Sequence, residues 1–428
     1  MKKVTIVGGG LSGSEAAWQL AKAGYLVDLY EMRPKVKTEA HKTGDLAELV
    51  CSNSFRGASL TNAVGLLKEE LRICGSLIME AADFAALPAG GALAVDRVRF
   101  SKYITEKIKS EPLITFHDGE VVKIPEPPCI IATGPLTSKG LAEAISEKIG
   151  QSELAFYDAI APIVYGESVN WEIVFKQSRY DKGGDDYANI PLSKDEYLKF
   201  IENIKSAEKV KPGEDLKPFE GCMPVEDMLE RGDETLRYGP LKPVGLTDPR
   251  TGTRPHAVVQ LRQDDKEGHL WNMVGFQTRM KFGEQVRVIR SLPGMENAEF
   301  VRMGSLHRNT FVNSPKCLNP SLELRDFKGV YLAGQITGVE GYVESTASGI
   351  AAVRHLIRGD IFPEETAIGS LCRYVSDPTR VDFQPMNISF GLMSSYFAED
   401  KASIRDKDQR RLKTSEQAIS SLRSFLAK

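Results

Sequence analysis

The sequence predicts an α/β protein with two domains, one of which is assembled from both ends of the chain. Three observations lead to this prediction: an apolar strand over 3–7 that runs into a glycine-rich turn and a helix, two later apolar strands over 129–133 and 329–333, and a different composition over 155–315. At roughly 150 residues per domain, 428 residues allow two or three domains. Apolar residues make up 42% and charged residues 26%, which is typical of folded proteins.

The opening of the chain predicts a β-α-β unit. The strand over 3–7 leads into a G-x-G-x-x-G turn and a helix over 14–23, and a second strand over 26–30 ends at Glu31. In Rossmann-like domains these glycines allow a tight turn, a close approach of pyrophosphate to the backbone, and close packing of helix on strand. An acidic residue after the second strand accepts hydrogen bonds from a ribose hydroxyl. The sequence therefore predicts a dinucleotide site at Glu31 and at the residues of the turn, Gly8, Gly9, Gly10, Leu11, Ser12 and Gly13.

The two later strands indicate which dinucleotide binds. One ends at Gly134 and the other at Gly334, and a helix rich in small residues is expected over 344–357. With the opening unit, these segments resemble the FAD domain of glutathione-reductase-like flavoproteins, in which they complete the cofactor site. The resemblance implies FAD bound against Gly134, Gly334 and Gln335, with the positive end of the last helix directed at the flavin. The alternative is three unrelated buried strands.

The middle of the chain predicts an inserted α+β domain. Residues 155–315 contain many turns, aromatic strands and a charged helical stretch over 193–209. We therefore expect residues 1–154 and 316–428 to form one discontinuous FAD-binding domain around the insertion. The sequence has no second G-x-G-x-x-G motif, so NADH or NADPH would have to bind transiently as a reductant.

Cysteine usage and hydropathy indicate the compartment. The six cysteines are scattered without a C-x-x-C pair, which disfavours a zinc site or a disulfide framework, and we expect no bound metal. Glycines interrupt the apolar run at the N-terminus before it resembles a signal peptide, and no apolar stretch is long enough to span a bilayer. These features predict a cytoplasmic protein without a membrane partner, and no stable protein partner is indicated.

Two cysteines lie in polar loops. Cys51 is followed by Ser52 and, five positions on, by Arg56, and Cys222 stands between a glycine and a Met-Pro turn. A thiol beside cations in a polar loop can be a reactive thiolate. From spacing alone, a purely structural role is the more common outcome for such a cysteine.

Seven motifs along residues 1–395 resemble the folate- and FAD-dependent tRNA (uracil-5-)-methyltransferases. The last of them is also similar to the larger flavin enzymes that modify wobble uridine. The motifs are the glycine turn and the segments 50–54, 88–97, 220–224, 261–264, 307–310 and 334–342.

The resemblance implies that the protein makes 5-methyluridine at position 54 of the tRNA T-loop. The methylene of 5,10-methylenetetrahydrofolate would be carried on reduced FAD, with NADH or NADPH as reductant. Uracil C5 is a poor nucleophile until a group such as a thiolate adds to C6. The resemblance assigns Cys222 as this nucleophile and Cys51 as the flavin-side thiol that holds the methylene carrier or acts as a base. It implies that Tyr342 packs on the flavin ring.

The charge balance limits how RNA could be held. The 55 basic and 58 acidic residues give a formal net charge of −3, which excludes binding by overall charge. Basic residues exceed acidic ones over 274–316 and over 401–428, so any RNA contact is expected at such patches. The basic residues of the first patch are Arg279, Lys281, Arg287, Arg290, Arg302, Arg308 and Lys316.

Three alternatives remain open at the level of sequence. The same chemistry could act on ribosomal RNA, because a change of RNA target would leave every motif in place. A NAD(P)H:flavin oxidoreductase acting on a small molecule would not need either loop cysteine. A flavoprotein that only binds and helps to fold tRNA would not need them either.

Overall fold

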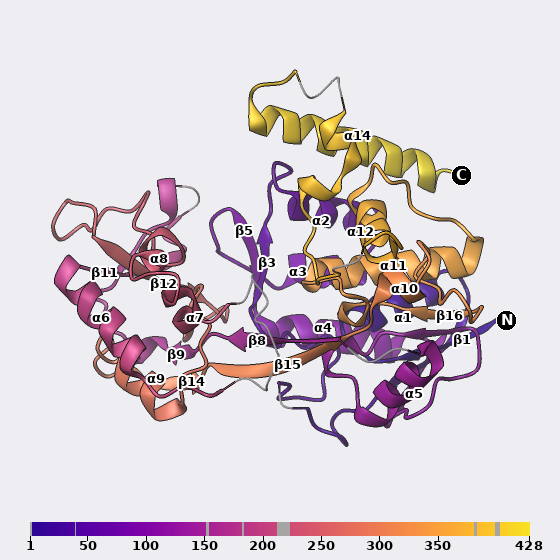
Figure 1. Ribbon diagram of the computed structural model, residues 1–428, viewed down its shortest axis with the longest axis horizontal. Helices are drawn as coiled ribbons and strands as arrows, with labels where there is room; N and C mark the ends of the chain where they lie inside the picture. The colour runs from indigo at the N-terminus through magenta and orange to yellow at the C-terminus, as the bar shows by residue number, and fades with distance from the viewer. Residues whose placement is uncertain are drawn as a thin grey trace.

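The computed structural model describes residues 2–38, 40–150, 154–181, 184–211, 223–380, 383–398 and 403–428. These residues form two lobes that lie side by side, each with its own sheet and buried apolar core (Figure 1). Both ends of the chain belong to the larger lobe, and helix α14 (Lys407–Leu426) lies along its outer side. Within the described part of the chain, no helix is both long and apolar enough to cross a membrane.

A parallel five-stranded sheet forms the centre of the larger lobe. Its strands are β1 (Lys3–Val7), β2 (Leu26–Glu31), β6 (Ile114–Asp118), β7 (Cys129–Ile131) and β16 (Val330–Leu332). The spatial order is β16-β7-β1-β2-β6, and all four pairings are parallel. Strand β16 lies beside β7 although some 200 residues separate them in the chain, so early and late segments build one sheet.

Helices pack around this sheet. They are α1 (Leu11–Lys22), α2 (Ala63–Ile73), α3 (Leu77–Phe84), α4 (Arg97–Ser110), α5 (Lys139–Ile149), α10 (Ser314–Cys317), α11 (Tyr342–Arg358) and α12 (Ala367–Ser376). The two helices predicted from the sequence are confirmed as α1 and α11, each beginning two or three residues earlier than expected. Helices α1 and α11 approach closely, because a Cβ on Gly349 would lie 2.5 Å from the backbone oxygen of Ser12.

A small sheet of β3 (Ser54–Gly57), β4 (Ala86–Leu87) and β5 (Ala92–Val95) lies on the side of the larger lobe that faces the smaller one (Figure 1). The turn between β4 and β5 touches the smaller lobe. There the Gly90 N–H donates to Asp186 over 2.6 Å, and the Tyr187 hydroxyl donates to the Ala89 carbonyl over 3.1 Å. The hairpin therefore links the two lobes.

An antiparallel six-stranded sheet forms the smaller lobe. Its strands are β9 (Ile163–Tyr165), β10 (Phe175–Lys176), β11 (Tyr187–Leu192), β12 (Ala257–Gln263), β13 (Leu270–Met273) and β14 (Phe300–Arg302), in the order β10-β11-β12-β13-β9-β14. Its helices are α6 (Lys194–Ser206), α7 (Val225–Leu229), α8 (Thr235–Tyr238) and α9 (Phe282–Ile289). The predicted charged helix is confirmed as α6, which Ser193 and Glu196 start with a reciprocal capping box.

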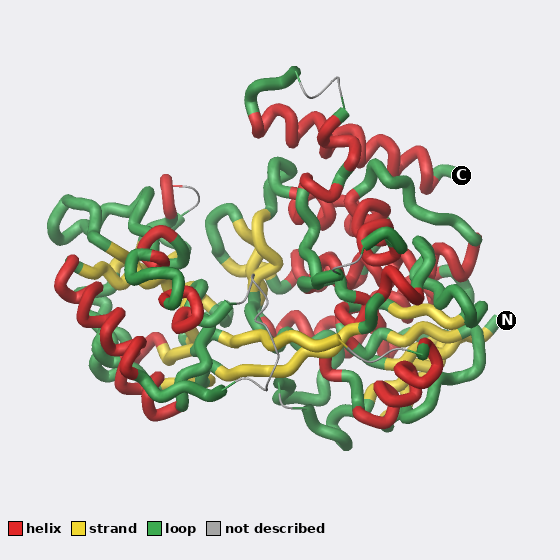
Figure 2. The backbone as a smooth tube through the Cα atoms, viewed as in Figure 1, coloured by secondary structure: helices red, strands yellow, loops and turns green. Residues whose placement is uncertain are grey.

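Two long strands connect the lobes. Strands β8 (Leu154–Ile160) and β15 (Ser305–Phe311) pair antiparallel over seven residues and run from one lobe to the other (Figure 2). The predicted domain boundaries fall at the start of β8 and just beyond the end of β15. The division into domains at those positions stays a prediction.

Candidate cofactor and thiol site

The glycine turn between β1 and α1 leaves room on one side only. A Cβ on Gly8, whose φ is +102°, would lie 2.5 Å from the Ala132 carbonyl oxygen, and a Cβ on Gly13 would lie 1.8 Å from the Gly8 carbonyl oxygen. Gly10 has φ −72°, and no heavy atom lies within 4 Å of a Cβ built there. The first and third glycines are therefore required by packing, whereas the second leaves open space at the N-terminus of α1, where a helix favours a phosphate.

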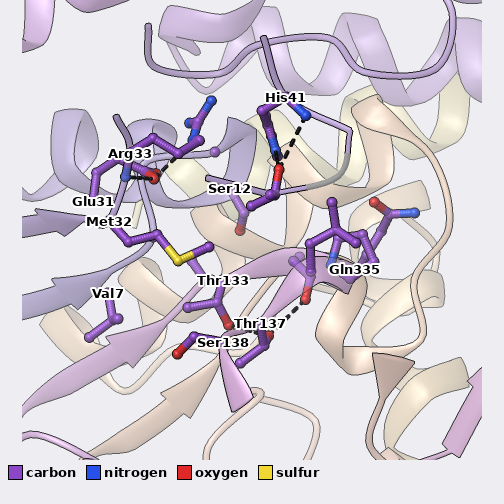
Figure 3. Close-up of a pocket in the computed structure, with 18 of the residues that line it drawn as sticks. Val7, Ser12, Glu31, Met32, Arg33, His41, Thr133, Thr137, Ser138 and Gln335 are labelled. Atoms are coloured by element: carbon purple, nitrogen blue, oxygen red, sulfur yellow. Dashed lines mark hydrogen bonds and ion pairs between the residues drawn. The ribbon is translucent and has the colours of Figure 1, made fainter. Parts of the chain in front are cut away.

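A cavity opens at the carboxyl ends of β1, β2, β7 and β16, where ligands bind in open α/β sheets. We call it the strand-end cavity (Figure 3). Of the residues predicted at the cofactor, those that line it are Gly8, Gly10, Leu11, Ser12, Glu31, Gly134, Gly334, Gln335 and Tyr342. Gly9 and Gly13 do not line it. Gly9 donates its N–H to Glu31 over 2.9 Å, and Gly13 packs against Gly8.

Glu31 is buried at one end of this cavity. Its Oε2 accepts from the Gly9 N–H, and its Oε1 accepts from the backbone N–H of Arg33 at 3.0 Å and from the Arg33 Nε–H at 2.9 Å. Burial raises the pKa of Glu31, but the hydrogen bonds and charge of Arg33 outweigh it, so the pKa lies below its usual range. The carboxylate is thus ionised, and an oxygen with two lone pairs can accept a further donor beside Gly9.

Several polar residues of the strand-end cavity were not predicted from the sequence, namely His41, Thr133, Thr137 and Ser138. In Figure 3, His41 lies beside the predicted Ser12 on one side, and Thr133, Thr137 and Ser138 lie on the other. The Thr133 and Thr137 hydroxyls are hydrogen-bonded at 2.7 Å. Their positions just beyond strand β7 are the available signal, because the ends of parallel strands face the ligand site.

A second cavity, the thiol cavity, continues from the first. Five residues line both cavities, namely Val50, Pro135, Leu136, Gln335 and Tyr342. Cys51, Ser52, Arg56, Asn309 and Glu340 are among the further residues of the thiol cavity. Gln335 is oriented there, since its Nε2 donates to both carboxylate oxygens of Glu340 at 2.7 and 2.8 Å. The structure therefore brings Cys51 next to the predicted cofactor residues.

Tyr342 stands where the two cavities meet. Its Oη accepts from the backbone N–H groups of Cys51 at 3.0 Å and of Ser52 at 3.1 Å, and its ring packs against Phe55. Burial, and then the charge of Cys51, raise the pKa of Tyr342, so its hydroxyl stays protonated at neutral pH. The predicted contact of this ring with a flavin stays a prediction.

Three arginines from distant parts of the chain hold the loop of Cys51. Arg97, Arg262 and Arg302 come from α4, β12 and β14. Arg262 donates to Ser52 Oγ at 2.8 Å and to Asn53 Oδ1 at 2.9 Å. Arg97 and Arg302 donate to backbone carbonyls of the loop. The loop is thus fixed by contacts from both lobes.

Cys222 lies outside the described residues. The chain after it can be followed: Met223 is buried, and the Val225 N–H donates to the Gln277 carbonyl at 2.9 Å. Gln277 lines the thiol cavity together with Cys51. Val225, three positions after Cys222, is therefore hydrogen-bonded to a residue that lines this cavity.

The two predicted basic patches differ in the structure. In the first, ion pairs join Arg279 to Asp227, Lys281 to Glu208 and Arg287 to Glu284, whereas Arg302 points into the loop of Cys51. The side chain of Arg308 is outside the described residues. In the second patch, α14 buries Thr414, Ser415, Ala418 and Leu422 and leaves basic side chains exposed, among them Lys407 and Arg423. The second patch is therefore the better candidate for phosphate contacts.

Known proteins match this chain over most of its length. The family model described as "Glucose inhibited division protein A" matches residues 3–360. A protein of Listeria monocytogenes named "Methylenetetrahydrofolate--tRNA-(uracil-5-)-methyltransferase TrmFO" is 54% identical over 433 residues, which covers 99% of this chain and 98% of that protein. Proteins of the same name from Lactobacillus johnsonii and Heliobacterium modesticaldum are 52% and 54% identical, with the same coverage of both chains.

The fold has a solved counterpart. A crystal structure of Aquifex aeolicus GidA superposes with a TM-score of 0.71 at 16% identity and covers 98% of this chain and 73% of that one. A second crystal form of the same protein gives 0.69 at 15% identity. At this identity the likeness shows the fold alone, and the relatives above show the family. The chain belongs to the glucose inhibited division protein A family and, within it, to the TrmFO methylenetetrahydrofolate–tRNA-(uracil-5-)-methyltransferases.

Proposed function

We propose that this protein methylates C5 of uridine 54 in the T-loop of tRNA, with methylenetetrahydrofolate as carbon donor, FAD as cofactor and NADH or NADPH as reductant. The relatives' printed names support the folate donor and the tRNA uridine. The structural observation that carries the proposal is the continuity of the two cavities through Tyr342, Gln335 and Val50. A reactive thiol beside a flavin site is what this chemistry requires.

The residues that would hold FAD fit that group. The space at Gly10 and the N-terminus of α1 suit a pyrophosphate, and the ionised Glu31 suits a ribose hydroxyl. The N-terminus of α11, close to Gly334 and Gln335, suits the flavin. Bound there, FAD supplies the redox chemistry and carries the one-carbon unit.

The chain's own residues would perform the acid–base and nucleophilic steps. The Cys222 thiolate adds to uracil C6, and the electron pair moves to make C5 nucleophilic. After C5 has gained the methylene group, Cys51 takes the C5 proton, and the Cys222 thiolate leaves C6 as the C5–C6 double bond returns. The methylene group still needs a hydride to become a methyl group as the bond to its carrier breaks, and reduced FAD, regenerated by NADH or NADPH, would supply that hydride. Two points support these roles: Cys51 lines the thiol cavity, and Val225, three positions after Cys222, is hydrogen-bonded to Gln277 of its lining.

The test is transfer of labelled carbon from methylenetetrahydrofolate to a T-loop transcript, with NADPH and the FAD-loaded enzyme. We expect Cys51→Ala and Cys222→Ala to lower the rate at least about a hundredfold, because each removes a reacting group. The matched control is Cys372→Ala, which removes a buried thiol of α12.

Two results would contradict the proposal. One is an absence of transfer by the wild type to tRNA when a ribosomal RNA fragment is labelled instead. The other is retained transfer in Cys222→Ala, which would rule out Cys222 as the nucleophile but would not contradict tRNA as the substrate.

A further inference from the structure

Arg302 belongs to the patch expected to contact RNA, yet it serves the loop of Cys51. It lies at the end of β14 in the smaller lobe. Its Nη1 donates to the Val50 carbonyl at 2.9 Å, and its Nη2 donates to the Cys51 carbonyl at 2.8 Å. One guanidinium thus holds two successive carbonyl groups with its planar fork.

A second guanidinium holds the same loop from the larger lobe. Arg97 donates from Nη1 to the Leu49 carbonyl and from Nη2 to the Cys51 carbonyl at 3.1 Å. Its Nε–H is directed at the carboxylate of Asp264, with oxygens at 2.9 and 3.1 Å. The Cys51 carbonyl therefore accepts from both arginines, one from each lobe.

These contacts fix the orientation of two peptide units. In a trans peptide the carbonyl and the N–H point in opposite directions. The Val50 and Cys51 carbonyls point at Arg302, so the Cys51 and Ser52 N–H groups point the other way, at the Tyr342 Oη. Each peptide is held at both ends, and the direction of the Cys51 side chain between them is set.

The charges around the thiol are mostly positive. The loop of Cys51 is contacted by three cationic side chains, Arg97, Arg262 and Arg302. Arg56 lines the same cavity and forms an ion pair with Glu344. The carboxylate of Asp264 forms an ion pair with Arg97. Glu340 lines the cavity near Gln335, and Tyr342 is neutral. Burial lowers the pKa of Arg302 to about 10, so its guanidinium remains charged at neutral pH.

We propose that Arg302 is a positioning residue for the Cys51 thiol. The planar guanidinium of Arg302 orients the loop of Cys51, and its positive charge stabilises the thiolate. This makes the reactivity of Cys51 dependent on a residue of the other lobe. The inference rests on the proposed role of Cys51 as a reactive thiol and is independent of which RNA is the substrate.

The experiment measures how fast iodoacetamide alkylates Cys51 as a function of pH in the FAD-loaded, full-length enzyme. Tryptic cleavage after Lys42 and Arg56 gives a peptide whose one cysteine is Cys51, so mass spectrometry reads this site directly. We expect Arg302→Met to move the midpoint of the pH profile upward by about one unit, because it removes a close positive charge. Arg302→Lys keeps the charge and is expected to keep the midpoint near that of the wild type.

The matched control is Arg290→Met, which removes an exposed arginine of the same lobe that donates to the Ala298 carbonyl. An Arg302→Met profile that superimposes on the wild type, or an equal shift in Arg290→Met, would overturn the proposal. An Arg302→Lys midpoint as high as that of Arg302→Met would overturn the role of charge.

If Arg302→Met does not fold, as judged by the bound FAD spectrum, Arg302→Gln replaces it. This neutral variant retains a donor amide, and the same upward shift is expected; no shift would reject the inference. Alkylation requires no RNA and no folate. A wild type that fails to methylate tRNA therefore refutes the proposed function and leaves this test of Arg302 intact.

Discussion

The glycine turn and the loop of Cys51 border the same pair of cavities but are built in different ways. Gly8, Gly10 and Gly13 lie within six residues, and Gly13 packs on Gly8 itself, although Gly8 also packs on Ala132 at the end of β7. The loop of Cys51 depends on Arg97 and Arg302, which come from two lobes. The glycine turn can therefore be recognised from a short stretch of sequence, whereas the loop of Cys51 depends on tertiary contacts from both lobes.

The largest effect is expected at Gly13. In Gly13→Ala the new Cβ would lie 1.8 Å from the Gly8 carbonyl oxygen, so strand, turn and helix must separate. We expect less than about a tenth of the purified protein to retain FAD, because overpacking of this kind forces backbone shifts. The measurement is the ratio of flavin to protein absorbance.

Gly283→Ala is the matched control, since that glycine lies in α9 with open space around it. It is expected to be neutral or slightly stabilising. Full FAD content in Gly13→Ala would show that the turn is not held as locally as described.

The next largest effect tests how far the loop of Cys51 depends on the smaller lobe. Asp264→Asn removes the buried carboxylate that pairs with Arg97, which should lower the free energy of unfolding by about 3 kcal/mol. It also makes the surroundings of Cys51 more positive, so the midpoint of Cys51 alkylation should move to lower pH, opposite to Arg302→Met. Denaturant unfolding and the alkylation profile measure the two effects, and a midpoint that moves upward would contradict the charge account.

A smaller effect is expected at Gly10, where a substitution should weaken FAD binding without disturbing folding. Gly10→Ala places its Cβ in open space with an allowed φ, so the protein without cofactor should fold as the wild type does. The same methyl group would occupy the approach of the pyrophosphate, and FAD affinity should fall by about tenfold or more. Equilibrium titration of the apoprotein with FAD checks this, and an unchanged Kd would place the pyrophosphate elsewhere.

The smallest effect concerns the two basic patches. Arg423→Glu on α14 changes an exposed arginine, whereas Lys281→Glu changes a lysine that already pairs with Glu208. We expect Arg423→Glu to weaken tRNA binding a few-fold and to reduce the slope of log Kd against log salt by about one, as for one lost phosphate contact. Lys281→Glu should change that slope less. The reverse order would favour the first patch.

The same contrast explains what could be predicted from the sequence. Strands over 3–7 and 26–30, the helix over 344–357 and the packing of Gly8 and Gly13 follow from local patterns. The structure confirms them, with the second strand extending to Glu31 and the helix beginning at Tyr342. The hydrogen bond from Arg302 to the Cys51 carbonyl could not be predicted, because no local sequence pattern relates positions 251 residues apart.

Counting charges along the chain does not show which basic side chains are already ion-paired. The partners that neutralise Arg279 and Lys281 are Asp227 and Glu208, which lie outside the counted stretch. Hydrophobic periodicity predicts elements, but it does not predict which charged side chains meet across a lobe boundary.

The most direct test of the central claim uses a T-loop transcript with 5-fluorouridine in place of the target uridine. Fluorine at C5 takes the place of the proton that must leave after C5 has gained the carbon, so the thiolate that adds to C6 cannot leave and the adduct accumulates. With FAD, folate and NADPH present, we predict one covalent RNA–protein adduct on the peptide that carries Cys222, lost in Cys222→Ala and retained in Cys51→Ala. An adduct on Cys51, or efficient methylation of ordinary RNA without any adduct on the fluorinated one, would contradict the account.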